Sequence, residues 1–313
     1  MSLAFVFPGQ GSQSLGMLTA LATQFPQVQQ TFLEASNVLG YDLWELVTNG
    51  PTESLNQTDK TQPAMLAAGI AVWRCWQASS DIKPAYFAGH SLGEYTALVA
   101  SGALDFSDAI KLVEQRGQFM QQAVPVGEGA MAAILGLDDD TVRTVCLEAA
   151  GDGVAEAVNF NSPGQVVIAG SASSINKATE LAKEKGAKRA LILPVSVPSH
   201  CALMKPAAEK LALSLTNVAM KAPEKPVIHN VSVSSAQGVT DIKLRLAQQL
   251  YNPVRWVETV QWFAEHGVDT LVECGPGKVL AGLTKRIDKS ISALAVFDPA
   301  TLDKAINALG EKQ

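Results

Sequence analysis

The chain has 313 residues, a formal net charge of −6 at neutral pH, 47% hydrophobic residues and 17% charged residues. This length can bury a large core, and the composition is that of a folded globular protein rather than a disordered one. The net negative charge does not favour binding to nucleic acid, so we expect no nucleic-acid partner. No apolar run approaches the ~20 residues that span a bilayer, and residues 1–7 lack the basic segment of a secretory signal. We therefore expect no membrane segment.

The cysteines and histidines show no metal-ligand spacing, and there is no C-x-x-C pair. This excludes the common zinc patterns and gives no disulfide framework, so we expect no metal and buried free thiols in the cytoplasm. The residues are Cys75, Cys146, Cys201, Cys274, His90, His200, His229 and His266.

Short β-like runs alternate with helical stretches from the N-terminus onward, which predicts an α/β fold with a mostly parallel sheet. Pro26 and Pro63 suit the first turn of a helix, where a missing N–H costs nothing. The expected elements are strands Leu3–Phe7, Ala85–Ala88 and Val227–Val231, helices Pro26–Leu39, Pro63–Gln77, Glu94–Ala100, Asp105–Ala123, Ala202–Leu215 and Asp241–Leu250, and a strand–turn–helix at Thr270–Leu283.

In residues 125–197 the predicted strands and helices follow the order β-α-β-β-α-β, which is typical of a ferredoxin-like unit. We predict an inserted ferredoxin-like subdomain at 125–197, with hinges near Pro125 and Pro198, in a catalytic core formed by residues 1–124 and 198–313. A cleft between two such bodies is a common place for an active site. The expected elements are Ala130–Leu137, Val142–Ala150, Val154–Asn159, Gln165–Ala169, Ser173–Lys185 and Arg189–Val195.

The strongest chemical signal is the run Gly89-His90-Ser91-Leu92-Gly93. A G-x-S-x-G run between a strand and a helix is typical of the nucleophile elbow of an α/β-hydrolase-like core, where a strained turn exposes the serine hydroxyl. Glycines fit there because neighbouring backbone passes within contact distance of the turn. The alternative is a structural turn without chemistry.

A serine nucleophile needs a base, and four histidines are available. His90 adjoins Ser91, so we expect its side chain to point away, and His266 lies where a helix ends and suits a cap. His229 falls inside a predicted strand. His200 lies in a turn at the return from the subdomain, where a base beside the cleft is expected. We favour His200, with His229 as the alternative.

Arg116 lies on the apolar stripe of the predicted helix Asp105–Ala123, three residues after Val113 and four before Met120. An inward guanidinium is costly without an anionic partner. One interpretation is a structural ion pair with an internal Asp or Glu. The other is a bidentate clamp for a substrate carboxylate, which together with Ser91 predicts acyl transfer on a substrate that bears a second, free carboxylate.

Two glycine-rich turns end predicted strands. The first, Pro8-Gly9-Gln10-Gly11-Ser12, lacks the third glycine of a dinucleotide motif, but its N–H groups could complete an oxyanion hole with the N–H of Leu92. The second, Gly275-Pro276-Gly277-Lys278, lacks the phosphate-loop pattern. We interpret it as a tight turn, with Lys278 as an alternative contact for a ligand phosphate.

Ordered motifs are spread over essentially the whole chain, and together they resemble those of the malonyl-CoA:acyl carrier protein transacylases of type II fatty acid synthesis. The motifs are Phe7-Pro8-Gly9-Gln10-Gly11-Ser12-Gln13, Thr61-Gln62-Pro63-Ala64, Gly89-His90-Ser91-Leu92-Gly93-Glu94-Tyr95, Gln115-Arg116-Gly117, Asn159-Phe160-Asn161-Ser162-Pro163-Gly164-Gln165, Val197-Pro198-Ser199-His200, Tyr251-Asn252-Pro253-Val254 and Glu273-Cys274-Gly275-Pro276-Gly277.

The resemblance implies that Ser91 accepts the acyl group, that His200 is its general base and that Arg116 binds the malonyl carboxylate. It also implies that the backbone N–H groups of Gln10 and Leu92 form the oxyanion hole.

The same resemblance implies that the main-chain carbonyl of Gln249 orients the histidine, in place of the acid of a Ser-His-Asp triad. Asn161 lies in a family motif near the cleft, and its role stays open. The run Val197-Pro198-Ser199-His200 resembles the type that accompanies malonyl rather than other extender units.

The resemblance further implies ping-pong transfer of a malonyl group from malonyl-CoA to the phosphopantetheine thiol of holo acyl carrier protein, through a malonyl-serine, for fatty acid synthesis. Malonyl-CoA is then a substrate and no cofactor is expected; we also expect a monomer. Two alternatives remain at this point: a serine thioesterase or esterase that releases the acid to water, and a non-catalytic protein that docks the carrier.

Overall fold

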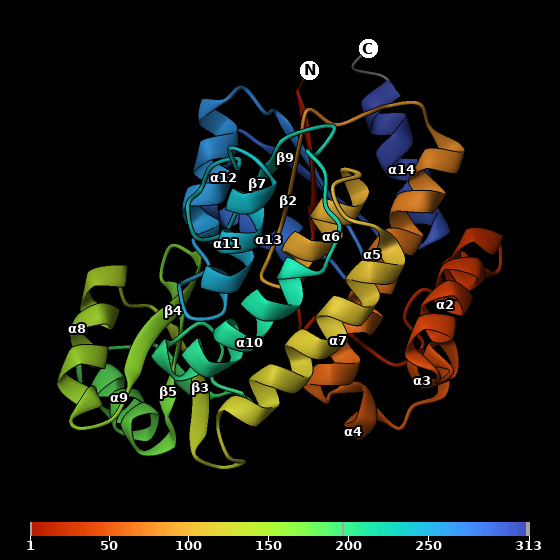
Figure 1. Ribbon diagram of the computed structural model, residues 1–313. Helices are drawn as coiled ribbons and strands as arrows, with labels where there is room; N and C mark the ends of the chain where they lie inside the picture. The colour runs from red at the N-terminus through yellow and green to blue at the C-terminus, as the bar shows by residue number, and fades with distance from the viewer. Residues whose placement is uncertain (1, 196, 311–313) are drawn as a thin grey trace.

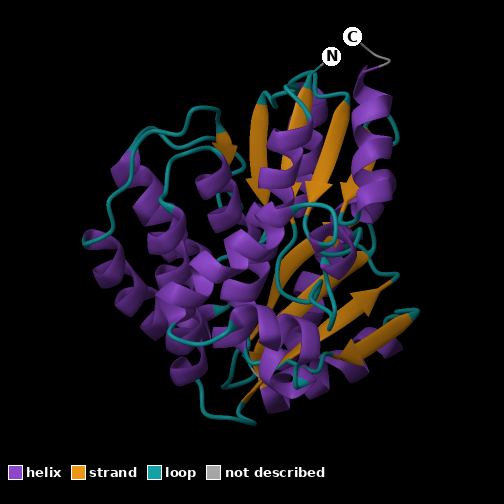
Figure 2. Ribbon diagram, turned by 90° about the vertical axis from the view of Figure 1, so that its right-hand side faces the viewer, coloured by secondary structure: helices purple, strands orange, loops and turns teal. Residues whose placement is uncertain are grey.

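The computed structural model describes residues 2–195 and 197–310. The described strands form two separate sheets, one of five strands and one of four. Figure 2 shows the two sheets end to end, with the arrowheads of the larger sheet pointing toward the smaller one. The carboxyl ends of the larger sheet's strands, where α/β folds bind their ligands, therefore face the smaller sheet.

The larger sheet is parallel throughout, in the order β7-β2-β1-β8-β9. In its first strand, Leu3, Phe5 and Phe7 enter one apolar cluster, whereas Ala4 and Val6 enter a cluster on the opposite face. Burial on both faces explains why this strand is a continuous apolar run in the sequence. The strands are β1 (Leu3–Phe7), β2 (Tyr86–Gly89), β7 (Val227–Ile228), β8 (Thr270–Cys274) and β9 (Ser292–Val296).

Helices cover both faces of the larger sheet (Figure 1). On the face of Ala4 and Val6, the apolar side chains come from α12 (Trp256–Glu265) and α13 (Val279–Ile287). The helices that contribute to the Phe5 cluster on the other face are α1 (Thr19–Ala22), α2 (Pro26–Leu39), α3 (Leu43–Asn49), α4 (Thr52–Leu55), α5 (Thr58–Ser79), α6 (Gly93–Ala100), α7 (Phe106–Ala123), η1 (Ala202–Met204), α10 (Lys205–Thr216), α11 (Val239–Gln249) and α14 (Pro299–Gly310).

The smaller sheet is antiparallel, in the order β4-β5-β3-β6. One face packs against its own two helices, and the other contributes Met131, Val158 and Val167 to a small cluster with Cys201. This strand order and the β-α-β-β-α-β sequence are those of a ferredoxin-like unit. The elements are β3 (Gly129–Leu135), α8 (Asp139–Ala150), β4 (Ala155–Ser162), β5 (Gln165–Ser171), α9 (Ala172–Glu184) and β6 (Arg189–Ile192).

The predicted fold class is confirmed, with a mostly parallel core sheet and a ferredoxin-like unit. We keep the division into a core of 1–124 and 198–313 and a subdomain of 125–197 as a proposal, which is supported because β3 to β6 lie between residues 129 and 192. Residues 1, 196 and 311–313, which fall within these ranges, lie outside the described residues.

Three details of the expected elements are wrong. The strand expected at Val227–Val231 ends at Ile228, so His229 lies outside it. The helix expected from Pro63 begins earlier, at Thr58, so the proline lies inside it. The extra turn forms because the Thr61 N–H donates to the Gln57 carbonyl at 2.7 Å. The strand expected to run to Val195 ends at Ile192, because the Val195 N–H donates to the Leu193 carbonyl at 2.8 Å in a tight local turn.

Candidate active site

Ser91 lies at the turn between β2 and α6, with a backbone φ of 52° in the left-handed region. The turn is so tight that a Cβ on Gly89 would lie 1.9 Å from the Gly93 carbonyl carbon. A Cβ on Gly93 would lie 2.0 Å from the Phe7 carbonyl oxygen. The Ser91 N–H donates to Asn230 Oδ1 at 2.7 Å, which helps to hold the strained residue. This is the geometry of a nucleophile elbow.

His200 reaches the Ser91 hydroxyl from the later half of the chain. Ser91 Oγ lies 2.8 Å from His200 Nε2, and His200 Nδ1 lies 2.7 Å from the main-chain carbonyl oxygen of Gln249. A carbonyl only accepts, so Nδ1 carries the proton and Nε2 accepts from the serine O–H. The imidazole therefore has the tautomer that a base for Ser91 requires.

The environment keeps this imidazole neutral. The pKa of His200 is lowered to about 3, mainly because the ring is buried, and also because the Arg116 cation and His90 are nearby. A lowered pKa means that the folded protein binds this proton less readily than the unfolded chain does. At neutral pH the Nε2 lone pair is therefore free to take a proton from Ser91.

The guanidinium of Arg116 is 1% exposed and lies beside the same hydroxyl. Its Nη2 donates to Ser91 Oγ at 3.2 Å and to Gln249 Oε1 at 2.9 Å, while its Nε has no hydrogen-bond partner among the residues that the structure describes. Burial lowers the pKa of Arg116. Within the described residues no Asp or Glu carboxylate lies within 4.0 Å of this side chain, so the interpretation as a structural ion pair is wrong. The guanidinium therefore has an N–H donor, on Nε, that is available for a ligand beside Ser91.

Gln10 and Leu92 face the same small cavity as Ser91. In the part of the chain that the structure describes, neither main-chain N–H donates to a protein acceptor. Leu92 is the N-cap of α6, so its N–H is one of the donors that a helix start leaves free. Both groups are thus available to donate, and their role as an oxyanion hole stays a prediction.

The cavity over Ser91 has a volume of about 110 Å³ and lies between the two sheets. The smaller sheet supplies one wall through Met131, Asn159 and Val167. The return segment supplies another, through Leu193, Val195, Val197 and Ser199. Such a volume suits a short acyl group rather than a long chain. The remaining lining residues are Gln10, His90, Ser91, Leu92, Arg116, Met120 and His200.

The prediction that the His90 side chain points away from the site is wrong. It lines the cavity, and its Nε2 lies 2.8 Å from Asn161 Oδ1 on β4. The left-handed φ of Ser91 ends the extended geometry in which successive side chains alternate between faces, and Asn161 of the smaller sheet contacts the ring. This contact also gives Asn161 a role that the sequence left open, as a link between the smaller sheet and the elbow.

The other two histidines lie outside the cavity: His266 caps a helix as expected, and His229, the alternative base, does not reach Ser91. His229 is buried, with Nδ1 2.7 Å from Glu94 Oε1, and it does not line the cavity. His266 is the C-cap of α12, with Nδ1 2.7 Å from the Trp262 carbonyl oxygen.

Lys278 does not belong to this site. It lines a different cavity, of about 470 Å³, together with Lys285 and Lys304. The turn before it is tight, since a Cβ on Gly275 would lie 2.9 Å from Pro8.

Sequence reasoning missed a buried polar network behind the serine. Glu94, one residue beyond the elbow, accepts from the Asn230 N–H at 2.8 Å and from Gln249 Nε2 at 3.0 Å. Asn230 Nδ2 donates to the Gly89 carbonyl at 2.7 Å. A carboxylate within the otherwise apolar start of α6, and an asparagine just past β7, were the available signals.

All four cysteines are buried and free, as expected. Among the described residues no group of three or more His, Cys, Asp or Glu side chains is placed to hold a metal ion. No described helix combines the length and the apolar character needed to cross a membrane.

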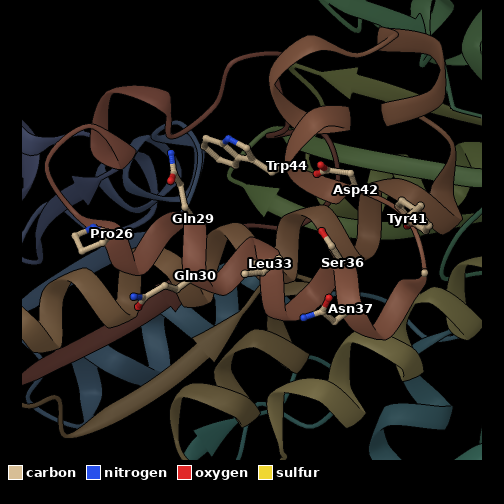
Figure 3. A pocket seen from close by; sticks show the side chains of 10 residues that line it. Pro26, Gln29, Gln30, Leu33, Ser36, Asn37, Tyr41, Asp42 and Trp44 are labelled. Atoms are coloured by element: carbon tan, nitrogen blue, oxygen red, sulfur yellow. The ribbon is translucent and has the colours of Figure 1, made fainter.

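Another cavity, of about 870 Å³, lies beside α2 and α3 (Figure 3). Its described lining includes no histidine, and the Ser36 hydroxyl there already donates to the Phe32 carbonyl and accepts from the Leu43 N–H. It lacks the serine and base that the cavity over Ser91 brings together.

Comparisons with known proteins agree with this geometry. Residues 4–299 match the family model of the acyl transferase domain. The chain is 55% identical over 303 residues to a malonyl CoA-acyl carrier protein transacylase of Escherichia coli, covering 97% of this chain and 98% of that protein. A counterpart from Haemophilus influenzae is 57% identical over 301 residues, covering 96% of each.

Solved structures give the same result. A crystal structure of an acyl carrier protein S-malonyltransferase from Vibrio cholerae has a TM-score of 0.95 at 59% identity, covering 97% of this chain and 100% of that one. A malonyl-transacylase solved in complex with its type II PKS acyl-carrier protein has a TM-score of 0.97 at 56% identity, covering 98% of this chain and 100% of that one. The elbow, the base and the whole-length similarity lead to one conclusion: the chain is an acyltransferase that belongs to the malonyl CoA-acyl carrier protein transacylase family.

Proposed function

We propose that the protein transfers a malonyl group from malonyl-CoA to the phosphopantetheine thiol of holo acyl carrier protein, through a malonyl-serine, and so supplies extender units for fatty acid synthesis. The observation that carries this proposal is the convergence on one hydroxyl: Ser91 Oγ lies 2.8 Å from His200 Nε2 and 3.2 Å from Arg116 Nη2. A nucleophile with a base and an unpaired cation suits an acyl donor that carries a second carboxylate.

In the first half-reaction, His200 Nε2 takes the proton of the Ser91 hydroxyl as Oγ attacks the thioester carbonyl carbon. The negative charge that develops on the carbonyl oxygen is met by the N–H groups of Gln10 and Leu92. The carbon–sulfur bond then breaks, the coenzyme A sulfur leaves with the proton from His200, and malonyl remains as an ester on Ser91.

In the second half-reaction, the carrier's thiol gives its proton to His200 Nε2 and its sulfur attacks the ester carbon. The bond to Ser91 Oγ breaks and the proton returns to the serine. The carbonyl of Gln249 keeps the proton of His200 on Nδ1 throughout, but as a neutral group it stabilises the imidazolium less than the carboxylate of a triad does.

We propose that Arg116 selects the malonyl group by binding its free carboxylate. The buried Nε without a partner among the described residues supports this, because a planar guanidinium can hold a carboxylate with two hydrogen bonds. We also propose that the enzyme acts as a monomer in the cytoplasm without a cofactor; the four buried free thiols support a reducing compartment.

Mass spectrometry after incubation with malonyl-CoA tests the proposal. We expect one malonyl adduct per chain in the wild type and in Ser14→Ala, an exposed serine that serves as the control, and none in Ser91→Ala. Adding holo carrier protein should move the adduct to the carrier. Release of free malonate instead would identify a thioesterase, and a wild type that never forms the adduct would refute the double displacement.

A further inference from the structure

Arg116 and Glu94 are two buried, oppositely charged side chains that do not touch. Arg116 is 1% exposed and Glu94 is 0% exposed. Burial lowers the pKa of Arg116, and the smaller opposing effects come first from Tyr95 and then from the Glu94 charge. In a low-dielectric interior such a pair gains most by direct contact. The side chain of Gln249 lies between them instead.

The Gln249 amide contacts both partners at once. Its Oε1 accepts from Arg116 Nη2 at 2.9 Å, and its Nε2 donates to Glu94 Oε2 at 3.0 Å. Nε2 also donates to the Ser91 carbonyl oxygen at 3.1 Å.

The chemistry of the neighbours fixes which way this amide points. In the reverse orientation, the NH₂ group would face the N–H donors of Arg116, and the oxygen would face the Glu94 carboxylate and the Ser91 carbonyl, which only accept. The alternating pattern of donor and acceptor therefore allows one orientation. Gln249 is 0% exposed, so water cannot substitute for either contact.

Glu94 is also held by donors on its other sides. His229 Nδ1 lies 2.7 Å from Oε1, and the Asn230 N–H donates to Oε2 at 2.8 Å. Together with Gln249 Nε2, these contacts satisfy the carboxylate without Arg116.

We propose that the side chain of Gln249 is a positioning residue that separates Arg116 from Glu94, so that the guanidinium stays aimed at Ser91 with its charge free for the acyl donor's carboxylate. This rests on the proposed function of Arg116. An amide oxygen occupies one N–H without neutralising the cation. A carboxylate in the same place would pair with the guanidinium, and the substrate would have to displace it.

The test is the Gln249→Glu variant, which keeps the shape of the side chain and leaves the main-chain carbonyl for His200. Acyl-enzyme formation is measured with malonyl-CoA and with acetyl-CoA. The second carboxylate oxygen of this variant faces Glu94 and the Ser91 carbonyl, which only accept, so we expect kcat/KM to fall for both donors. The loss for malonyl-CoA should exceed that for acetyl-CoA by about 10-fold, mainly through KM, because acetyl has no carboxylate to compete.

Gln248→Glu is the matched control, since it adds the same charge one residue earlier on α11 at a side chain without a hydrogen-bond partner among the described residues. It should leave both substrates within about 2-fold of wild type. In an Arg116→Ala background, Gln249→Glu should no longer favour one substrate over the other, because the cation it neutralises is gone.

Equal losses for malonyl-CoA and acetyl-CoA in Gln249→Glu, or a selective loss that persists in the Arg116→Ala background, would overturn the proposal in favour of a merely structural glutamine. If Gln249→Glu does not fold, Gln249→Met removes both contacts without adding charge. A larger loss of kcat/KM for malonyl-CoA than for acetyl-CoA then supports the proposal, and equal losses overturn it. The proposed function fails separately, when the wild type itself forms no malonyl-enzyme.

Discussion

The two sheets of this enzyme differ in what they bury. In the parallel sheet and behind its carboxyl ends lie the buried Glu, Arg and His side chains of the described residues, namely Glu94, Arg116, His200, His229 and Glu273. In the described part of residues 125–195, the buried polar side chains are neutral hydroxyls, those of Ser162, Ser174 and Thr179.

This difference indicates a division of labour. A buried charged side chain is costly unless hydrogen bonds satisfy it. The network around Gln249 provides such hydrogen bonds. The smaller sheet has an ordinary apolar core and contributes one wall of the cavity. We therefore expect substitutions in the first region to change selectivity, and substitutions in the second to change stability.

The largest expected effect is that of Arg116→Ala. It should raise the barrier for malonyl transfer by roughly 2–5 kcal/mol, because a desolvated charge contact with the substrate carboxylate is lost. Acetyl transfer should be affected much less. Steady-state kinetics with both donors measure this, with Arg143→Ala, a half-exposed cation on the smaller unit, as the control. Equal losses for the two donors would mean that Arg116 is structural.

Ile168→Ala, in the core of the smaller sheet, tests the other region and should change stability rather than selectivity. Ile168 is fully buried, so the cavity should cost about 2–5 kcal/mol of unfolding free energy, and Ile168→Val about 0.5–1.5 kcal/mol. Denaturant unfolding measures both. The ratio of malonyl to acetyl transfer by the folded protein should not change, and a changed ratio would break the division between the two regions.

A smaller effect is expected where the two regions meet. Asn161→Ala removes the contact of 2.8 Å between Asn161 Oδ1 and His90 Nε2, which is worth about 1 kcal/mol. We expect acyl-enzyme formation to slow by about 5-fold for both donors, measured by rapid quench and mass spectrometry. Asn176→Ala, exposed on α9, is the control. A selective loss for malonyl would instead place Asn161 at the substrate carboxylate.

Local patterns predicted much of the fold. The strand Leu3–Phe7 and the helix Pro26–Leu39 match the structure at both ends, since an apolar run before a glycine turn and a proline at a helix start are local signals. The edge strand β9 and the last helix α14 were not predicted. The pairing of β9 with β8 is a long-range event, and its residues Ser292–Val296 are only partly buried.

The site was predictable where one residue type implies one chemistry, as for Ser91 in its elbow and Arg116 on an apolar face. The direction of the His90 side chain was not, because it depends on the path of the chain through a left-handed residue. Gln249 could be named for its carbonyl by resemblance, but its side chain could not be told from that of Gln248. Only the placement of α11 shows which of the two adjacent amides faces the buried charges.

The partner of the catalytic imidazole is a main-chain oxygen, and this has an evolutionary consequence. In a triad, a single codon change can delete the acid that orients the histidine. Here every amino acid at position 249 has a carbonyl, so that contact depends on where α11 ends rather than on which side chain stands at 249. Selection at this position can then act on the side chain alone, which leaves it free to evolve donor selectivity while the machinery of acyl transfer stays intact.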